Sequence, residues 1–429
     1  MLLLVILLGC SPLSNNADSI STATSIADIS IQSSPTSQPS PTASVASTQP
    51  IPEISTDCVD ITPVSEDGLG GTLVFQKGLG DQLIFVENRT RNQKYVPADP
   101  SMKVWQAYVS PDGKWLIYEL DWGDPNGETK FVLTKADGLT QKEIPNDGYW
   151  GASSIFWLNN SNLRVTETDN GVTYIDNFAY NPFTGKESAL RSELPDVTYH
   201  KNIDWHIDQQ AYELGVLTGT NLIYDPTLTR VLYPKSSDSV SLFNLETNQE
   251  ITRQSVPGWG RLPKWSSGGR SLAIISSMSS SLKREALDEF LIVSRDGPEF
   301  QRLTYLTSVF KSVHIEDYNW SPDGNQIAFW LQTDNNKLVN DQNPFELAVL
   351  DLKTGNIINY CIAGISTVEY ETYTMPANIV WSPDSTQLLI TRHKDDNKQT
   401  EVLVVDLMNK TAYKVTENMQ PIGWMTREP

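Results

Sequence analysis

A short phrase built around a tight turn recurs along the chain. It reads Val-Ser-Pro-Asp-Gly at residues 109–113, Trp-Ser-Pro-Asp-Gly at 320–324 and Trp-Ser-Pro-Asp-Ser at 381–385. Proline presets φ for the turn, aspartate bonds back to nearby backbone, and glycine supplies the positive φ that closes it. Each phrase therefore predicts the end of one strand and the start of an antiparallel neighbour. Degenerate copies begin at Trp157, Tyr224 and Trp265.

A second hairpin follows each phrase, as in Leu347–Asn356 and Val402–Lys410. Seven such hairpins, at intervals of about 50 residues, match the four-stranded unit of a β-propeller blade. The one candidate helix, Ser281–Phe290, looks like an insertion. We therefore predict an all-β fold, a β-propeller with seven blades. Six or eight blades stay open as alternatives, because Ile203–His206 resembles a further strand end.

The two ends of the chain are expected to meet in one blade. Pro421–Trp424 has the pattern of an inner strand that ends in tryptophan, and the chain stops soon after it. The first hairpin, Thr72–Val96, has outer strands but no such strand before it. Pairing the two closes the ring and removes an exposed sheet edge.

The Trp-Ser-Pro-Asp-Gly phrases resemble the repeat of TolB-type propellers, a TolB-like and WD-repeat-like pattern that also occurs in the propeller domains of prolyl oligopeptidases. The resemblance covers most of the chain from Gly71 to Trp424 and implies the fold, structural aspartates and protein contact within the cell envelope. A peptidase of the related kind needs a hydrolase domain with a Gly-x-Ser-x-Gly motif, which the sequence lacks. We assign no catalytic residue.

The N-terminus has the pattern of a targeting segment. Met1–Leu8 is apolar and too short to span a bilayer, and it ends in Leu-Leu-Gly-Cys at residues 7–10. This ending resembles the lipobox of bacterial lipoproteins, which implies a signal peptide over 1–10 and lipidation of Cys10. The alternative is a buried strand that happens to precede a cysteine. We expect an extracytoplasmic, membrane-anchored lipoprotein of a bacterium.

Residues 11–57 have the composition of a stalk. Ser, Thr and Pro make up 25 of the 46 residues from Ser11 to Thr56, with no Lys, Arg or aromatic among them. Such a segment cannot bury enough apolar surface to offset its chain entropy, so we predict a disordered tether. The propeller then occupies 58–429.

Charge and metal-ligand content exclude several functions. The chain has 52 acidic and 32 basic side chains, a net charge of -20, which argues against a nucleic-acid partner. With three cysteines and four histidines (His200, His206, His314 and His393) at no ligand spacing, we expect no metal and no cofactor. The acidic loop 121–128 departs from calcium-loop spacing. Cys58 and Cys361 either form a disulfide that pins the stalk to the ring or stay free.

Aromatic residues recur a few positions before the strand-ending residues. In a propeller these positions converge on the face around the axial opening, where ligands usually bind. Exposed aromatics there would provide contact area for a partner, whereas the alternative is packing between blades. The residues that we assign to this binding face are Trp105, Trp122, Trp150, Trp259, His314, Glu316 and Tyr373.

These features predict a protein-binding or scaffold module at the cell envelope. Its partner would be an envelope protein or a peptidoglycan-associated partner, and its membrane contact would be the lipid anchor. The alternative is a propeller hydrolase or carbohydrate-binding protein that uses Asp204, Glu316 or Asp317 at the axial mouth. Paired carboxylates perform glycoside chemistry only about 5 to 9.5 Å apart.

Overall fold

The structure is a computed structural model, and it describes sixteen segments of the chain. These are residues 54–62, 70–78, 80–87, 90–121, 129–144, 154–169, 173–189, 223–236, 239–256, 263–278, 287–335, 344–364, 367–369, 374–376, 379–393 and 399–426. The predicted signal peptide, Cys10 and most of the stalk lie outside these residues. Trp122, Trp150, Asp204, Trp259 and Tyr373 lie outside them as well.

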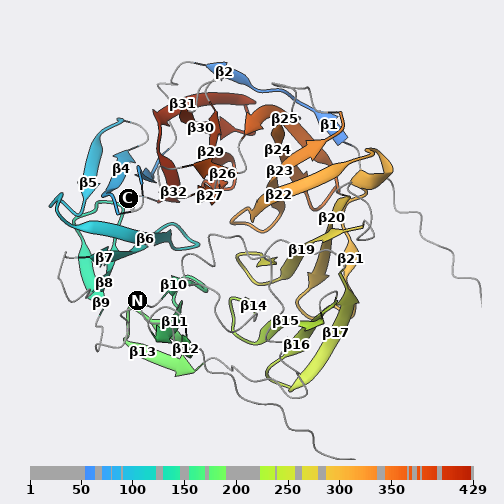
Figure 1. Cartoon of the computed structure of the whole chain (residues 1–429), viewed down its shortest axis with the longest axis horizontal. Coiled ribbons are helices and arrows are strands. Elements are labelled where there is room, and N and C mark those ends of the chain that lie inside the picture. Colours follow the sequence, from blue (N-terminus) through green and yellow to red (C-terminus); the bar gives the residue numbers. More distant parts are fainter. Residues whose placement is uncertain are drawn as a thin grey trace, which may run out of the picture. The chain divides into compact units, whose positions relative to one another are not determined.

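The described strands form seven antiparallel blades arranged in a ring (Figure 1). This confirms the all-β propeller and settles the blade number at seven. From the inner to the outer strand, blade 1 contains β32 (Gln420–Met425), β3 (Thr72–Gln76), β4 (Leu83–Glu87) and β5 (Gln93–Val96). Blade 2 contains β6 (Lys103–Val109), β7 (Leu116–Asp121), β8 (Thr129–Thr134) and β9 (Gln141–Ile144). Blade 3 contains β10 (Ser154–Trp157), β11 (Leu163–Asp169), β12 (Thr173–Asn181) and β13 (Lys186–Ala189).

The remaining four blades follow in chain order. Blade 4 contains β14 (Ile223–Tyr224), β15 (Arg230–Ser236), β16 (Ser239–Asn244) and β17 (Gln249–Ser255). Blade 5 contains β18 (Lys264–Trp265), β19 (Ser271–Ser277), β20 (Asp288–Ser294) and β21 (Gln301–Arg302). Blade 6 contains β22 (Val313–Trp320), β23 (Gln326–Thr333), β24 (Phe345–Asp351) and β25 (Ile357–Gly364). Blade 7 contains β28 (Val380–Trp381), β29 (Gln387–His393), β30 (Thr400–Asp406) and β31 (Thr411–Glu417).

Blade 1 closes the ring with strands from both ends of the sequence. The inner strand β32 pairs antiparallel with β3, with Met425 opposite Thr72 and Trp424 opposite Leu73. The predicted closure is therefore confirmed. Strand pairing, however, starts before the expected boundary at residue 58, because β1 (Ile54–Thr56) pairs with the outer strand of blade 6. After that boundary, β2 (Asp60–Thr62) pairs with the outer strand of blade 7.

The core lies between the blades, so the middle strands bury both faces. All four residues from Val402 to Val405 on β30 are fully buried, which explains why these strands read as continuous apolar runs rather than as alternating patterns. Aromatic edge-to-face contacts join blade 5 to blade 6: the Phe290 ring lies 5.2 Å from those of Tyr318 and Phe329.

The predicted helix over Ser281–Phe290 is wrong at its described end. Residues from Asp288 onward form β20, and Asp288–Ser294 pairs with all of Ser271–Ser277 on β19. The apolar side chains there meet both neighbouring blades, and this burial outweighs the local helix propensity of the preceding residues. The described segments contain only a short 3-10 helix, Leu306–Ser308, and no helix long and apolar enough to cross a membrane.

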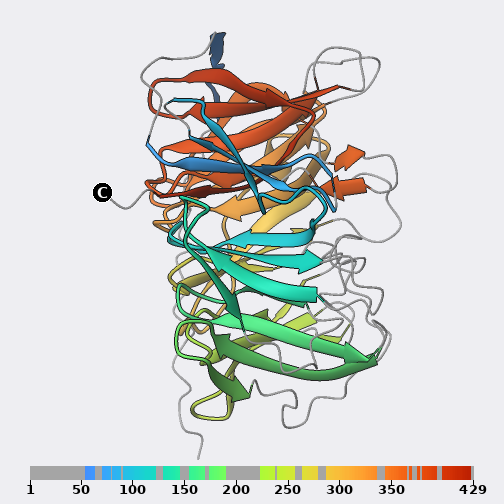
Figure 2. The same cartoon turned by 90° about the vertical axis from the view of Figure 1, so that its left-hand side faces the viewer.

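The two ends of the blades differ. First and second strands, except in blade 1, and third and fourth strands are joined by tight turns at one end, which we call the turn end; Trp320 to Gln326 is an example. The other connections join strands at the opposite end, which we call the loop end, as between Ile144 and Ser154. Figure 2 shows the small hairpin of β26 (Thr367–Glu369) and β27 (Thr374–Pro376) at the loop end.

Candidate functional site

The strand-ending tryptophans connect neighbouring blades. The inner strand of each blade has no strand partner on its axial side, so its backbone groups there need other partners. Four indole Nε1 atoms donate to the backbone carbonyl that directly precedes the strand-ending residue of the preceding blade. These bonds run from Trp157 to Tyr108 (2.9 Å), Trp265 to Ile223 (3.2 Å), Trp320 to Lys264 (2.8 Å) and Trp381 to Asn319 (3.1 Å).

The turns that follow the tryptophans form a second set of contacts. Within the turn of blade 6, Ser321 Oγ donates to Asp323 Oδ1 (2.6 Å) and accepts from the backbone of Gln326 (2.9 Å). Between turns, the Asp323 amide donates to Ser385 Oγ on blade 7 (3.2 Å). The Thr426 amide donates to the Gly113 carbonyl on blade 2 (2.8 Å). Residues of the repeated phrase therefore form hydrogen bonds both within a turn and between neighbouring turns.

The hydrogen bonds also set the ionisation of the turn aspartates. Burial alone would raise the pKa of Asp323, but donors from Ser321 and Asn325 outweigh it and hold the pKa below its usual value. Ser382 and Thr386 act on Asp384 in the same way and lower its pKa. Both carboxylates therefore act as ionised turn caps, as the resemblance implies.

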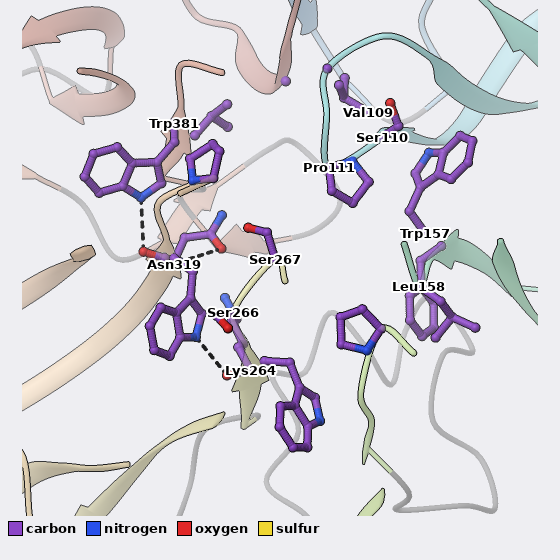
Figure 3. Close-up of a pocket in the computed structure, with 18 of the residues that line it drawn as sticks. Val109, Ser110, Pro111, Trp157, Leu158, Lys264, Ser266, Ser267, Asn319 and Trp381 are labelled. Carbon is purple, nitrogen blue, oxygen red and sulfur yellow. Dashed lines mark hydrogen bonds between the residues drawn. The ribbon is translucent and has the colours of Figure 1, made fainter. Parts of the chain in front are cut away.

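A cavity of about 450 Å³ lies on the axis at the turn end (Figure 3). All seven blades line it through their strand-ending residues: Val109, Trp157, Tyr224, Trp265, Trp320, Trp381 and Trp424. Polar side chains on its wall already bond to the protein, since Asn319 Nδ2 donates to the Ile379 carbonyl (3.1 Å) and Lys264 Nζ to Asp317 (2.9 Å). The cavity therefore offers mainly apolar ring surfaces and no pair of groups arranged for catalysis among its described lining residues.

Trp105 lies at the loop end of β6 and is half-buried. Its Nε1 donates to Asp121 Oδ2 of the same blade (3.3 Å), and its six-membered ring packs against Gly80 of blade 1, 3.7 Å from the position of an added Cβ. For this residue, packing between blades accounts for the contacts that the structure shows.

His314 and Glu316 lie together near the start of β22. His314 Nε2 is 3.1 Å from Glu316 Oε2, with 37% of the histidine side chain and 19% of the glutamate side chain exposed. The imidazole also meets the ring of Phe345 edge-on at 5.3 Å. The two residues, both assigned to the binding face from the sequence, are therefore adjacent and partly exposed near the start of β22.

Asp317, the other candidate carboxylate on this strand, is bound by a cation from the preceding blade. Lys264 Nζ donates to Asp317 Oδ1 (2.9 Å) and to the Tyr318 carbonyl (2.6 Å). Burial raises the pKa of Tyr318, so its hydroxyl stays protonated. That hydroxyl donates to the Ala273 carbonyl (2.8 Å) and accepts from the Lys264 amide (2.9 Å). Of the three carboxylates of the hydrolase alternative, Glu316 therefore faces an imidazole and Asp317 an ammonium group, whereas Asp204 lies outside the described residues.

Cys58 and Cys361 form a disulfide across 303 residues of sequence, with their Cα atoms 4.9 Å apart. The bond fastens the segment after the stalk to the outer strand of blade 6. No group of three or more His, Cys, Asp or Glu side chains within the described segments is placed to hold a metal ion.

Together these features define a seven-bladed β-propeller whose inner strands are joined by indole-to-carbonyl bonds and whose N-terminal segment is fastened to its rim. No protein-family model matches the chain, and no curated protein matches it in sequence. Among solved structures the chain is similar to TolB from Acinetobacter baumannii, at 10% identity over 82% of both chains with a TM-score of 0.41.

Two further similarities are to propellers of other kinds. The β-propeller domain of Cps50 (Swd1) from Myceliophteria thermophila is 12% identical over 83% of this chain and 98% of its own, with a TM-score of 0.42. An oligogalacturonate lyase from Vibrio parahaemolyticus is 11% identical over 81% of this chain and 86% of its own, with a TM-score of 0.46. The structures similar to this chain thus include TolB, whose repeat the phrases resemble.

Proposed function

We propose that the protein is a lipid-anchored, extracytoplasmic propeller that binds a protein partner of the cell envelope at its loop end. The difference between the two ends supports this most directly. The turn end consists of tight turns that bond to one another, whereas the longest connections, such as the one from Ala189 to Ile223, all start and finish at the loop end. Binding sites are typically built on such connections above a rigid scaffold.

The described charged groups on β22 fit binding better than hydrolysis. Glu316 faces His314, and Asp317 is bound by Lys264, so each carboxylate already has a partner. A general acid and base for glycoside chemistry would need carboxylates available to substrate and water. Charged groups with partial exposure suit the polar rim of a protein interface.

Capture of the envelope partner by the purified protein tests the proposal. We expect Trp150→Ala and Trp259→Ala, which alter the predicted binding face, to lose a partner that wild type recovers after cross-linking. Met408→Ala is the matched control, because Met408 is 77% exposed on a turn-end connection. Equal recovery by all of these variants would reject the loop end as the binding face.

Fractionation tests the anchor separately. If Cys10 is lipidated, Cys10→Ala should move the folded protein from the membrane to the soluble extracytoplasmic fraction. An unchanged distribution would mean that residues 1–10 are no lipid anchor. Wild type in the cytoplasm would overturn the proposed location altogether.

A further inference from the structure

A short N-terminal segment runs along the outside of two blades. We call Ile54–Thr62 the strap; it lies on the outer side of blades 6 and 7 in Figure 1. Its first strand, β1, pairs in parallel with Ile357–Asn359 of β25. Its second strand, β2, pairs in parallel with Thr411–Tyr413 of β31. Between them the Asp57 amide donates to the Asn359 carbonyl (2.8 Å). The strap therefore adds a fifth strand to each of these blades.

The strap covers the outer strand that most needs a cover. An outer strand presents unpaired backbone groups that can pair with another chain, and charged side chains are the usual protection. Among the seven outer strands that the structure describes, six carry at least one Lys, Arg or Glu: β5, β9, β13, β17, β21 and β31. The seventh, β25, reads Ile-Ile-Asn-Tyr-Cys-Ile-Ala-Gly and carries none.

The length and composition of β25 increase this exposure. It has eight residues, whereas β5, β9 and β13 have four each and β21 has two. Uncharged segments without proline that are rich in β-branched and aromatic residues are the typical sequence for strand-to-strand self-association. A second copy of this chain offers the same uncharged strand, so two β25 edges match one another in charge and length.

The strap itself holds its place weakly apart from the disulfide. Each of its strands pairs over only three residues, and Ile61 is 46% exposed. Ile54 and Val59 pack against the cores of the blades but are only partly buried, and an ion pair joins Asp57 to Lys410. Cys361 belongs to β25, so the Cys58–Cys361 bond ties the strap covalently to the strand that it covers.

We propose that the strap is an edge guard, locked by the Cys58–Cys361 disulfide, that keeps β25 from pairing with β25 of a second copy. The guard is independent of the partner at the loop end. When the lock is absent, the three-residue pairs open and the uncharged edge becomes available for pairing. The unlocked protein then associates with itself in a concentration-dependent manner.

A matched pair of variants tests this in the soluble full chain carrying Cys10→Ala. Cys58→Ser/Cys361→Ser removes the lock and leaves β25 uncharged, whereas Cys58→Ser/Cys361→Lys removes the same lock but adds a charge at an exposed position of the edge. Light scattering after size exclusion should show monomeric locked protein and at least a twofold higher mass for the Ser/Ser variant. The Ser/Lys variant should stay monomeric.

Each other outcome counts against the guard. A folded Ser/Ser variant that stays monomeric over the concentration series overturns it, and equal association of both variants shows that another surface is responsible. If the variants do not fold, folded wild type is treated with a dithiol in native buffer. The dithiol supplies two electrons and two protons to the two sulfurs and is itself oxidised to a cyclic disulfide; the thiols are then alkylated. Association is again expected, and a monomer rejects the proposal.

Discussion

Replacing Trp320 by phenylalanine tests whether the indole-to-carbonyl bonds hold the ring together. The change keeps an aromatic ring on β22 but removes the donor that reaches the Lys264 carbonyl at 2.8 Å. Leaving a buried acceptor without its partner costs about 1–3 kcal/mol. The smaller ring adds a void that costs about 1 kcal/mol, because Trp320 is only 5% exposed. The carbonyl is only partly buried, so the cost of losing its donor lies in the lower part of that range. Adding the packing cost, we expect the free energy of unfolding to fall by about 2–3 kcal/mol.

Trp424→Phe is the matched control. Trp424 is equally buried, at 3% exposure, but its Nε1 makes a longer bond of 3.4 Å, to Gly70. It should therefore lose mainly the packing contribution, about 1 kcal/mol. Urea unfolding followed by far-ultraviolet circular dichroism measures both without depending on tryptophan emission. Equal losses in the two variants, with unchanged m-values, would refute the reasoning, because packing alone would then explain both.

Three further predictions concern the turns and the disulfide. Gly113→Ala should lower the melting temperature more than Gly324→Ala: both glycines have positive φ (+71° and +70°), but a Cβ at Gly113 would lie 3.1 Å from Pro383 and from the Trp424 carbonyl, against 3.6 Å from Ser266 at Gly324. Asp323 has a lowered pKa, so the stability that its ionised form provides is present above about pH 4 and is lost as pH falls through the folded-state pKa. Urea unfolding as a function of pH should show a shallower acid loss in Asp323→Asn, and an identical slope would contradict the turn-cap role. Reduction of the Cys58–Cys361 bond should lower the free energy of unfolding by about 5 kcal/mol, since it closes a loop of 303 residues; a loss below about 1 kcal/mol would show that the denatured state is little constrained by it.

The fold was predictable because its determinants are local and repeat. Proline, aspartate and glycine fix the turns at 109–113 and 320–324 from within five residues, and seven hairpins at recurring intervals favoured seven blades over six or eight. Ring closure followed from one unpaired strand pattern at each end of the chain. Ser385 shows the tolerance of this chemistry, because it occupies the glycine position with φ of +63° and uses its hydroxyl to accept from Asp323.

The contacts between blades could not be predicted in the same way. The acceptor of the Trp320 indole lies on Lys264, in another blade, and whether the two meet depends on how the blades tilt against each other. For the same reason, the sequence alone does not decide whether a tryptophan of the predicted face binds a partner or packs between blades. In the structure Trp105 packs against Gly80 and bonds to Asp121, whereas His314 and Glu316 lie side by side and partly exposed.

The composition of the strap explains why its two strands were not predicted from the sequence. Ile54–Thr56 continues the Ser- and Thr-rich sequence before it, and a strand of three residues has too few positions to show a period. The sequence signal lies instead in the strand that the strap covers, since the six other outer strands carry charged side chains and β25 carries none. Because an uncharged outer edge can pair with another chain when nothing covers it, the absence of charge in one strand out of seven is a signal that another segment of the chain pairs there. Cys361, placed in that strand, indicates where the cover is fastened.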